Sequence, residues 1–168
     1  MRILVTRPGA DGQALAKLLR ELGTEVVLEP ILAIRELGVV AVNTDGVQAY
    51  LSTSANSVRA LANTGPDFRI PLFAVGDTTA TVARQSGFTT VHSASGDATA
   101  LANLVKDVLD PVGGSLIHVA GDAQAGDLNG ELQRYGFECR LEVLYETETV
   151  KSLTAAPVAA IKSDSIDI

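Results

Sequence analysis

The feature that most constrains the fold is a joint that recurs four times along the chain. Each time, a short apolar run ends in small polar residues, and a stretch with the composition of a helix follows. The four joints are Val5-Thr6-Arg7-Pro8, Leu51-Ser52-Thr53-Ser54, Val75-Gly76-Asp77-Thr78 and Val119-Ala120-Gly121-Asp122. This alternation is typical of a parallel sheet with right-handed helical crossovers. We therefore predict an α/β fold.

The joints also indicate where a ligand binds. In an open α/β sheet, ligands bind at the carboxyl ends of the strands. A helix that begins there offers free backbone N–H groups, a hydroxyl cap and the positive end of its dipole. Such a surface suits carboxylates or phosphates. We expect the chain to hold an anionic ligand through backbone amides and one or two local arginines.

Composition excludes several classes of function. The formal charge of −7 disfavours a nucleic-acid partner, which requires a basic surface. No apolar run reaches the roughly 18 residues that span a membrane, and no secretory signal precedes the first strand. The single cysteine, Cys139, excludes an internal disulfide and fits a reducing compartment. We expect a cytoplasmic protein.

Hydrophobic periodicity and glycine stops predict the elements in detail. Strands are expected at 2–6, 25–28, 31–34, 50–53, 72–75, 89–92, 115–119, 137–144 and 166–168. Helices are expected at 9–22, 56–63, 77–86, 97–108, 125–135 and 153–161. Residues 36–48 are interpreted as a linker followed by a short helix or irregular segment. Because the last strand lacks the rest of its unit, we interpret the chain as a fragment or a truncated family member.

Several motifs, taken in order, carry a resemblance to a known family. They are Val5-Thr6-Arg7-Pro8, Thr53-Ser54-Ala55-Asn56-Ser57, Ala74-Val75-Gly76-Asp77-Thr78-Thr79, Gly96-Asp97-Ala98, Gly121-Asp122 and Leu144-Tyr145-Glu146-Thr147. The ordered set resembles uroporphyrinogen-III synthase and covers essentially the whole chain. The resemblance implies two flavodoxin-like parallel-sheet lobes joined by a two-stranded linker, with its strands near 30–36 and 142–148. Lobe one would hold 1–33 and 147–168 and be incomplete here; lobe two would hold 36–144.

The resemblance also implies an activity. The family cyclises hydroxymethylbilane, a linear tetrapyrrole rich in carboxylates, to uroporphyrinogen III. The terminal pyrrole ring is inverted and water is lost, so the enzyme is a lyase of tetrapyrrole and haem biosynthesis. No metal or organic cofactor is implied, and a monomer is expected for the family. The partner is therefore a polycarboxylate small molecule.

Site residues follow from the same resemblance. Tyr145 matches the family's tyrosine after the return strand, and a phenol is protonated at neutral pH and can act as a proton donor. Contacts to the substrate are expected from Thr6, Arg7, Ser54, Asn56, Gly76, Thr79 and Gly121. Each has a structural alternative: a linker tyrosine packed between lobes, a surface ion pair for Arg7, helix capping for Thr79, or plain turn geometry for Gly76.

Other functions are less well supported. His92 and His118 are interpreted as structural, because neither has a partner at metal-ligand spacing. A nucleotide-binding domain lacks its glycine-rich fingerprints, and a response-regulator receiver lacks an acidic pair after the first strand. The main alternative to the enzyme is a non-catalytic α/β module that binds small molecules, or an inactive truncated relative.

Overall fold

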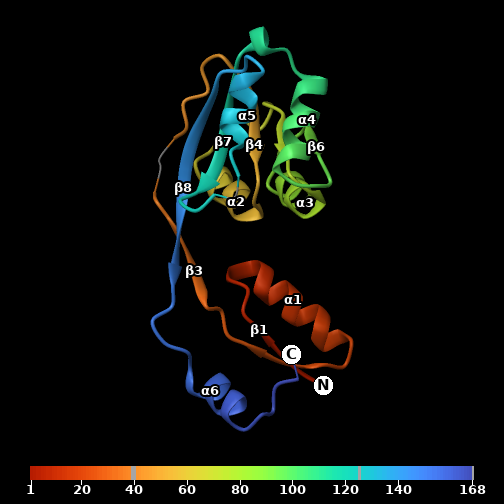
Figure 1. Cartoon of the computed structure of the whole chain (residues 1–168), viewed down its shortest axis with the longest axis vertical. Coiled ribbons are helices and arrows are strands. Elements are labelled where there is room, and N and C mark those ends of the chain that lie inside the picture. The colour runs from red at the N-terminus through yellow and green to blue at the C-terminus, as the bar shows by residue number, and fades with distance from the viewer. Residues whose placement is uncertain (39–40, 125, 168) are drawn as a thin grey trace. The chain divides into compact units, whose positions relative to one another are not determined.

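The computed structural model describes residues 1–38, 41–124 and 126–167 (Figure 1). The predicted α/β fold is confirmed, with helices alternating with mainly parallel strands. The chain divides into two compact units. Unit one comprises Met1–Arg35 and Thr147–Ile168, and unit two comprises Glu36–Glu146. In the described part of the chain, no helix combines the length and apolarity needed to cross a membrane.

Unit one is built on one parallel strand pair and two helices. Strands β1 (Arg2–Val5) and β2 (Glu25–Leu28) pair in parallel, and α1 (Gly9–Glu21) connects them. Helix α6 (Ala155–Lys162) belongs to the returning segment. As predicted, a glycine ends α1, because Gly23 adopts a φ of +80° that favours glycine.

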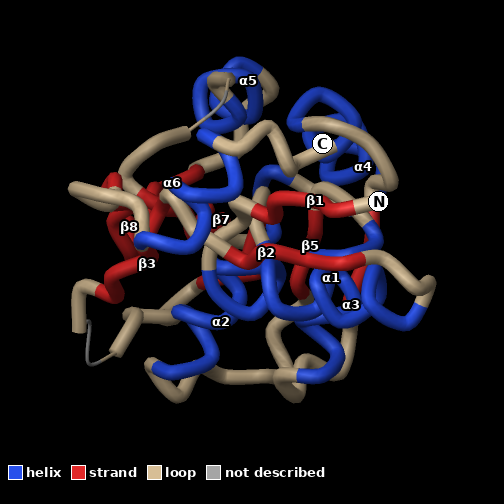
Figure 2. Tube along the Cα trace, turned by 90° about the horizontal axis from the view of Figure 1, so that it is seen from below, coloured by secondary structure: helices blue, strands red, loops and turns tan. Residues whose placement is uncertain are grey.

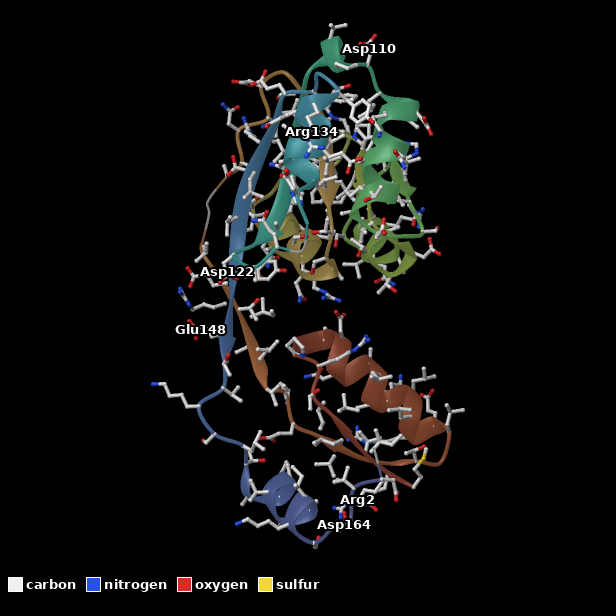
Figure 3. The ribbon with its side chains drawn as sticks, in the orientation of Figure 1. Arg2, Asp110, Asp122, Arg134, Glu148 and Asp164 are labelled. Atoms are coloured by element: carbon white, nitrogen blue, oxygen red, sulfur yellow. The ribbon has the colours of Figure 1, made fainter. Side chains whose placement is uncertain are left out.

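Hydrogen bonds at both ends of the returning segment attach it to this core. The buried carboxylate of Glu29 accepts hydrogen bonds from the backbone N and the Oγ1 of Thr154, at 2.5 and 2.8 Å, where α6 begins. The backbone N of Asp167 donates to the carbonyl of Arg2, labelled in Figure 3. The strand expected at 166–168 is nevertheless wrong for 166–167, where this single bond forms no ladder, and residue 168 lies outside the described residues.

Unit two contains most of a six-stranded sheet in the order β3-β8-β7-β4-β5-β6. The strands are β3 (Leu32–Glu36), β4 (Val47–Ser52), β5 (Leu72–Ala74), β6 (Val91–Ser93), β7 (Ser115–Gly121) and β8 (Cys139–Thr149). β7 pairs in parallel with β4 and β8, and β5 pairs in parallel with β4 and β6. The neighbouring strands β3 and β8 each continue from one unit into the other.

Helices cover both faces of this sheet (Figures 1 and 2). They are α2 (Ala55–Asn63), α3 (Asp77–Gln85), α4 (Ala98–Val108) and α5 (Leu128–Arg134), with a 3₁₀ turn η1 (Pro111–Gly113) before β7. Leu51 and Phe73 point into a core shared with Leu101 of α4 and Leu132 of α5. Tyr50, the neighbour of Leu51, faces the other way and meets the ring of Phe88 edge-on. This alternation along buried strands produces a core on each face.

Three predicted boundaries are corrected. For 36–48 the structure agrees with the irregular segment and not with the short helix in the described part, with residues 39–40 outside the description; β4 begins at Val47 and not at residue 50. The helix expected from 125 begins at Leu128, because the Asp127 carboxylate accepts from the N of Gly130 and caps it there. Residue 125 itself is not described. β8 runs to Thr149, past the end at 144 that hydrophobicity predicts, because its last residues pair beside β3; β3 and this part of β8 are the strands that the resemblance implies near 30–36 and 142–148.

Candidate functional site

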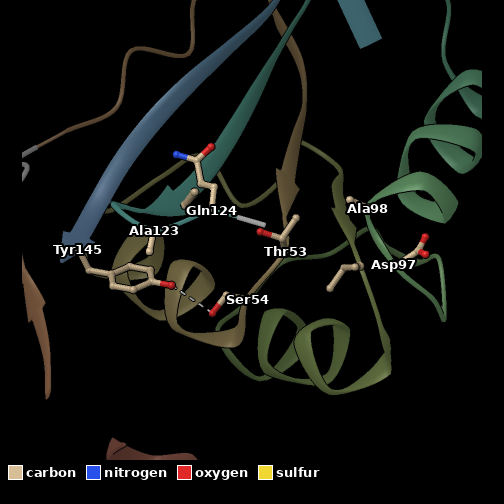
Figure 4. A pocket seen from close by; sticks show the side chains of 10 residues that line it. Thr53, Ser54, Asp97, Ala98, Ala123, Gln124 and Tyr145 are labelled. Carbon is tan, nitrogen blue, oxygen red and sulfur yellow. Dashed lines mark hydrogen bonds between the residues drawn. The ribbon is translucent and has the colours of Figure 1, made fainter. Parts of the chain in front are cut away.

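A cavity of about 330 Å³ opens in unit two at the carboxyl ends of its central strands (Figure 4). Its lining comes from the joints that follow β4, β5, β6 and β7, and from β8. The lining residues are Thr53, Ser54, Val75, Asp97, Ala98, Ala120, Gly121, Ala123, Gln124 and Tyr145. The cavity therefore lies at the edge of the sheet where the sequence predicts ligand binding.

Tyr145 lies on β8, and its ring packs over Gly121 of β7 to reach the cavity. A Cβ atom added to Gly121 would lie 2.6 Å from the Cε2 and Cζ atoms of the tyrosine ring and 2.9 Å from its hydroxyl. The ring thus packs directly on the backbone of β7, and the side chain is almost buried, with 7% of Tyr145 exposed. The role of Gly121 is to leave room for this ring.

The Tyr145 hydroxyl points toward Ser54 (Figure 4). It donates to the Ser54 Oγ over 3.4 Å, which is long for an O–H···O hydrogen bond. The same Oγ accepts from the backbone N of Asn56 at 3.1 Å and so caps α2. Because this hydrogen bond is long, the phenol O–H can turn toward an acceptor on a ligand.

Two buried hydroxyls fix the backbone of Ser54. Ser52 and Ser57 both donate to the Ser54 carbonyl, at 2.9 and 2.8 Å, and their Oγ atoms lie 2.7 Å apart. Both side chains are fully buried. Their contacts hold the turn between β4 and α2 in one conformation, which sets where Ser54 meets the tyrosine.

Asp97 forms a second polar group of the lining. It is the N-cap of α4, and its Oδ1 accepts from the backbone N of Ala100 at 2.9 Å. The loop before it is tied to α3, because Ser93 and Ser95 donate their hydroxyls to Asp77 Oδ1 at 2.7 and 3.0 Å. These hydrogen bonds lower the pKa of the Asp77 carboxyl. In the view of Figure 4, Asp97 lies across the cavity from Tyr145.

The electrostatic character of the cavity differs from the prediction. Asp97 is the one charged side chain in the described lining, and that lining includes no lysine, arginine or histidine. The local arginines expected to hold an anion are therefore not found around this cavity. Among the residues that the structure describes, no group of three or more metal-ligating side chains occurs. The lining offers a phenol, hydroxyls, an amide and one carboxylate.

The structure brings three of the predicted site residues together: Ser54, Gly121 and Tyr145 all line the cavity. Asn56 lies beside it in the first turn of α2, where its side-chain oxygen accepts from Arg59 at 2.8 Å. Gly76 is the N-cap of α3, and an added Cβ there would meet nothing within 4 Å. Thr79 is buried in the same helix, outside the lining.

Thr6 and Arg7 lie in unit one, in the loop between β1 and α1. The Thr6 carbonyl accepts from the backbone N of Ile31 at 3.3 Å, and Arg7 is exposed. A Cβ at Gly12 would lie within van der Waals overlap of the Arg7 carbonyl oxygen, so α1 requires glycine there to approach this loop. These two residues belong to the other unit and form no part of the cavity in unit two.

Sequence reasoning missed three polar residues of the lining: Thr53, Asp97 and Gln124. Thr53 and Asp97 lie within the motifs of the resemblance, but neither is predicted as a site residue. The available signal was topological, since Asp97 follows β6 and forms a fifth joint at the same sheet edge. Gln124 lies in the loop after β7 and carries no comparable sequence signal.

Burial explains two further reactive side chains of unit two, His118 and Cys139. His118 is buried in β7, and its Nδ1 lies 2.7 Å from the Oδ1 of Asn129, so Nδ1 carries the proton that this amide oxygen accepts. Burial lowers the pKa of His118. Burial also raises the pKa of the Cys139 thiol to about 11, which leaves it protonated and unreactive.

Comparison with known proteins identifies the family. The family model for uroporphyrinogen-III synthase HemD matches residues 13–168. A uroporphyrinogen-III synthetase from Helicobacter pylori superposes with a TM-score of 0.62 at 17% identity, over 95% of this chain and 68% of that one. A mutant uroporphyrinogen III synthase from the extremely thermophilic bacterium Thermus thermophilus superposes with a TM-score of 0.58 at 18% identity, over 99% and 70%. No curated protein matches significantly. The chain belongs to the uroporphyrinogen-III synthase family.

Proposed function

We propose that this chain is a uroporphyrinogen-III synthase that cyclises hydroxymethylbilane with inversion of the terminal pyrrole ring and loss of water. It would act as a monomeric lyase in the cytoplasm, in the biosynthesis of tetrapyrroles and haem, without a metal or organic cofactor. Family membership supports the substrate class. The observation that carries the proposal is the nearly buried Tyr145, whose side chain lines a cavity at the expected sheet edge.

The proposed role of Tyr145 is to protonate the leaving hydroxyl. In this step the C–O bond of the terminal hydroxymethyl group breaks, the phenol proton moves to the oxygen, and water leaves. The substituted carbon of the terminal ring then attacks the resulting cation, which passes through a spiro intermediate to the inverted product. After ring closure, the terminal pyrrole loses a proton and becomes aromatic again. This proton returns to the phenolate of Tyr145 and restores the phenol.

Geometry is the second contribution of the protein. The bilane closes unaided to the wrong isomer, so the enzyme must hold one reactive conformer. Orientation of this kind contributes several kcal/mol to lowering a barrier. Ser54 and Gly121 support the proposal, because each touches Tyr145 and restricts where its hydroxyl lies. Gly76, Thr79, Asn56, Thr6 and Arg7 remain proposed contacts for other parts of the substrate.

The test is an assay of the purified chain with freshly generated hydroxymethylbilane, read as the ratio of type III to type I product. Mostly type III product, formed faster than spontaneous closure, would support the proposal. Type I product at the spontaneous rate would contradict it and favour the alternative of a non-catalytic binding module.

Tyr145→Phe tests the role of the hydroxyl in the same assay. The substitution keeps the ring that packs on Gly121 and removes only the proton donor, so we expect the rate of type III formation to fall by about 10²–10⁴-fold. Tyr135→Phe is the matched control. Tyr135 is 56% exposed and lies under the Lys106 ammonium, away from the cavity lining, so its variant should keep full activity. An equal effect of the two substitutions would contradict the assignment.

A further inference from the structure

The cavity in unit two has to receive carboxylates without a cationic side chain. Every pyrrole ring of the proposed substrate bears carboxylate groups, so a ring that brings its hydroxymethyl group to Tyr145 also brings carboxylates into the cavity. The described lining includes no lysine, arginine or histidine. Neutral hydrogen-bond donors are therefore the groups that can hold a carboxylate there, and a bond from such a donor to an ionised acceptor is a strong one.

Two polar side chains of the lining have no partner within the protein. Among the described residues, neither the Thr53 hydroxyl nor the Gln124 amide makes a hydrogen bond. Thr53 is half-buried just after β4, and Gln124 is exposed in the loop after β7. Hydroxyls that serve the fold are bonded inside it, as those of Ser52 and Ser57 are. The groups at positions 53 and 124 are therefore available to a ligand.

Ser54 supplies a third donor beside them. Its Oγ accepts from the backbone N of Asn56 at 3.1 Å and from the Tyr145 hydroxyl at 3.4 Å. A serine hydroxyl can donate one hydrogen bond while it accepts two, and in the described part of the chain this proton has no acceptor. Two consecutive residues, Thr53 and Ser54, thus offer hydroxyl protons to the same cavity.

These donors lie on the Tyr145 side of the cavity. In Figure 4, the Thr53 hydroxyl is turned toward the side where Tyr145 and Gln124 lie, and the Asp97 carboxylate points away from that side. The volume of about 330 Å³ is at the lower end of the range for ligand pockets, about 300–1,000 Å³. The cavity therefore takes part of a tetrapyrrole, close to the proposed proton donor.

We infer that Thr53 and Gln124, together with the Ser54 hydroxyl, form a neutral subsite that binds a carboxylate of the substrate ring whose hydroxymethyl group meets Tyr145. The inference rests on the proposed function for the identity of the ligand. The two hydroxyls and the amide N–H donate to the carboxylate oxygens. These bonds are the same in the bound substrate and in the transition state, so the subsite acts on substrate binding and not on the rate of bond cleavage.

The first test measures KM and kcat for type III product separately in variants of Thr53. Affinity for the porphyrin formed by oxidation of that product is measured in parallel by fluorescence titration. Thr53→Val removes the hydroxyl and keeps the branched shape. We expect KM to rise by about 5- to 50-fold at unchanged kcat, because a hydrogen bond to a charged group is lost. Thr53→Ser keeps the hydroxyl and should retain both the wild-type KM and the porphyrin affinity.

Gln124→Glu distinguishes a carboxylate ligand from a pyrrole N–H at the same place. The substitution keeps the size of the side chain and replaces an amide donor with a negative charge. If Gln124 faces a carboxylate, affinity should fall by about tenfold or more, and further than in Gln124→Leu, because repulsion is added to the lost bond. An unchanged or higher affinity in Gln124→Glu would overturn the inference, because the facing group would then be a donor.

Matched controls come from α3. Thr81 and Gln85 are exposed there and do not line the cavity. Thr81→Val and Gln85→Glu make the same chemical changes and should leave KM, kcat and porphyrin affinity unchanged. An equal loss of affinity in Gln85→Glu and Gln124→Glu would overturn the inference, because it would come from the overall charge. Since Gln124 is exposed in a loop, its variants keep the inference testable even if Thr53→Val lowers the temperature of unfolding.

The outcomes separate the subsite from the proposed function. A wild-type chain that forms type III product, with variants at 53 and 124 that bind and turn over like it, would overturn the subsite and leave the proposed function intact. A wild-type chain that forms no type III product but binds the porphyrin, with affinity lost in Thr53→Val and Gln124→Glu, would support the subsite and overturn the proposed function. A chain that does neither would overturn both.

Discussion

Gly121→Ala is the substitution whose effect follows most directly from the structure. The added Cβ would lie 2.6 Å from two ring carbons of Tyr145, whereas ordinary contacts begin at 3.4 Å. The ring must therefore move by about 0.8 Å or the strands must separate. Overpacking of a buried site costs about 1–3 kcal/mol, and we expect a loss of stability in that range by urea unfolding.

The same displacement should affect the hydroxyl. Its contact with Ser54 is already 3.4 Å long, so a ring that moves away from β7 leaves hydrogen-bonding distance or changes direction. If Tyr145 is the proton donor, activity should fall with the stability. Gly76→Ser is the steric control for stability, because an added Cβ at Gly76 meets nothing within 4 Å and serine is a favourable N-cap residue.

A double-mutant cycle between positions 121 and 145 separates the steric clash with the tyrosine ring from other effects of Gly121→Ala. Tyr145→Leu removes the ring atoms that the new methyl group would meet and keeps an apolar side chain in the site. In that background Gly121→Ala should cost little, so the coupling free energy between the two positions should be about 1–2 kcal/mol. An equal cost in both backgrounds would refute the reasoning, because the destabilisation would then come from the backbone of β7 and not from the ring.

Two further predictions concern buried side chains within β7 and β8. Cys139 should react only slowly with a thiol-specific disulfide reagent at pH 8 and rapidly in urea, because burial raises its pKa to about 11; fast labelling of the folded chain would contradict this. Burial lowers the pKa of His118, so the unfolded chain binds a proton below about pH 6.5 that the folded chain does not. Stability should therefore fall as the pH drops from about 7.5 to about 5.5. His118→Gln should flatten that slope.

Much of the fold was predictable, because the signals in it are local. The apolar runs of β4, β5 and β7 are buried on both faces and therefore appear as continuous runs in the sequence. Glycines end α1 and α3 where a left-handed residue is required, at Gly23 and Gly87. These features do not depend on the rest of the molecule, so most strands and helices are predictable to within a few residues.

The wrong boundaries have non-local causes. The last residues of β8, from Glu146 to Thr149, are polar and partly buried or exposed, so hydrophobicity gives no signal for them. Their strand conformation comes from pairing beside β3, and Glu148, labelled in Figure 3, forms an ion pair with Arg35 at 2.7 Å that joins the two strands there. A partner more than a hundred residues away cannot be inferred from local periodicity.

The site shows the same division. Tyr145, Ser54 and Gly121 were predicted from motifs, and the structure brings them to one cavity. Asp97 was seen in the sequence only as part of a helix start, since its place in the cavity depends on the neighbouring positions of β5 and β6 in the sheet. Topology, and not residue type, distinguishes this capping aspartate from Asp127.

The position of Tyr145 depends on a single extra residue in β8. Ala120 pairs with Val143, but Gly121 pairs with Tyr145, so Leu144 is inserted as a bulge. In strict register Gly121 would pair with Leu144, and the tyrosine would be displaced along the strand toward Asp122. The bulge places the ring opposite the residue that has no side chain, and Leu144 and Tyr145 are consequently both buried in succession. Strict alternation along a strand predicts one buried residue in two. Two large apolar residues in succession, Leu144 and Tyr145, are therefore the sequence signal of the bulge that places the tyrosine hydroxyl in the cavity.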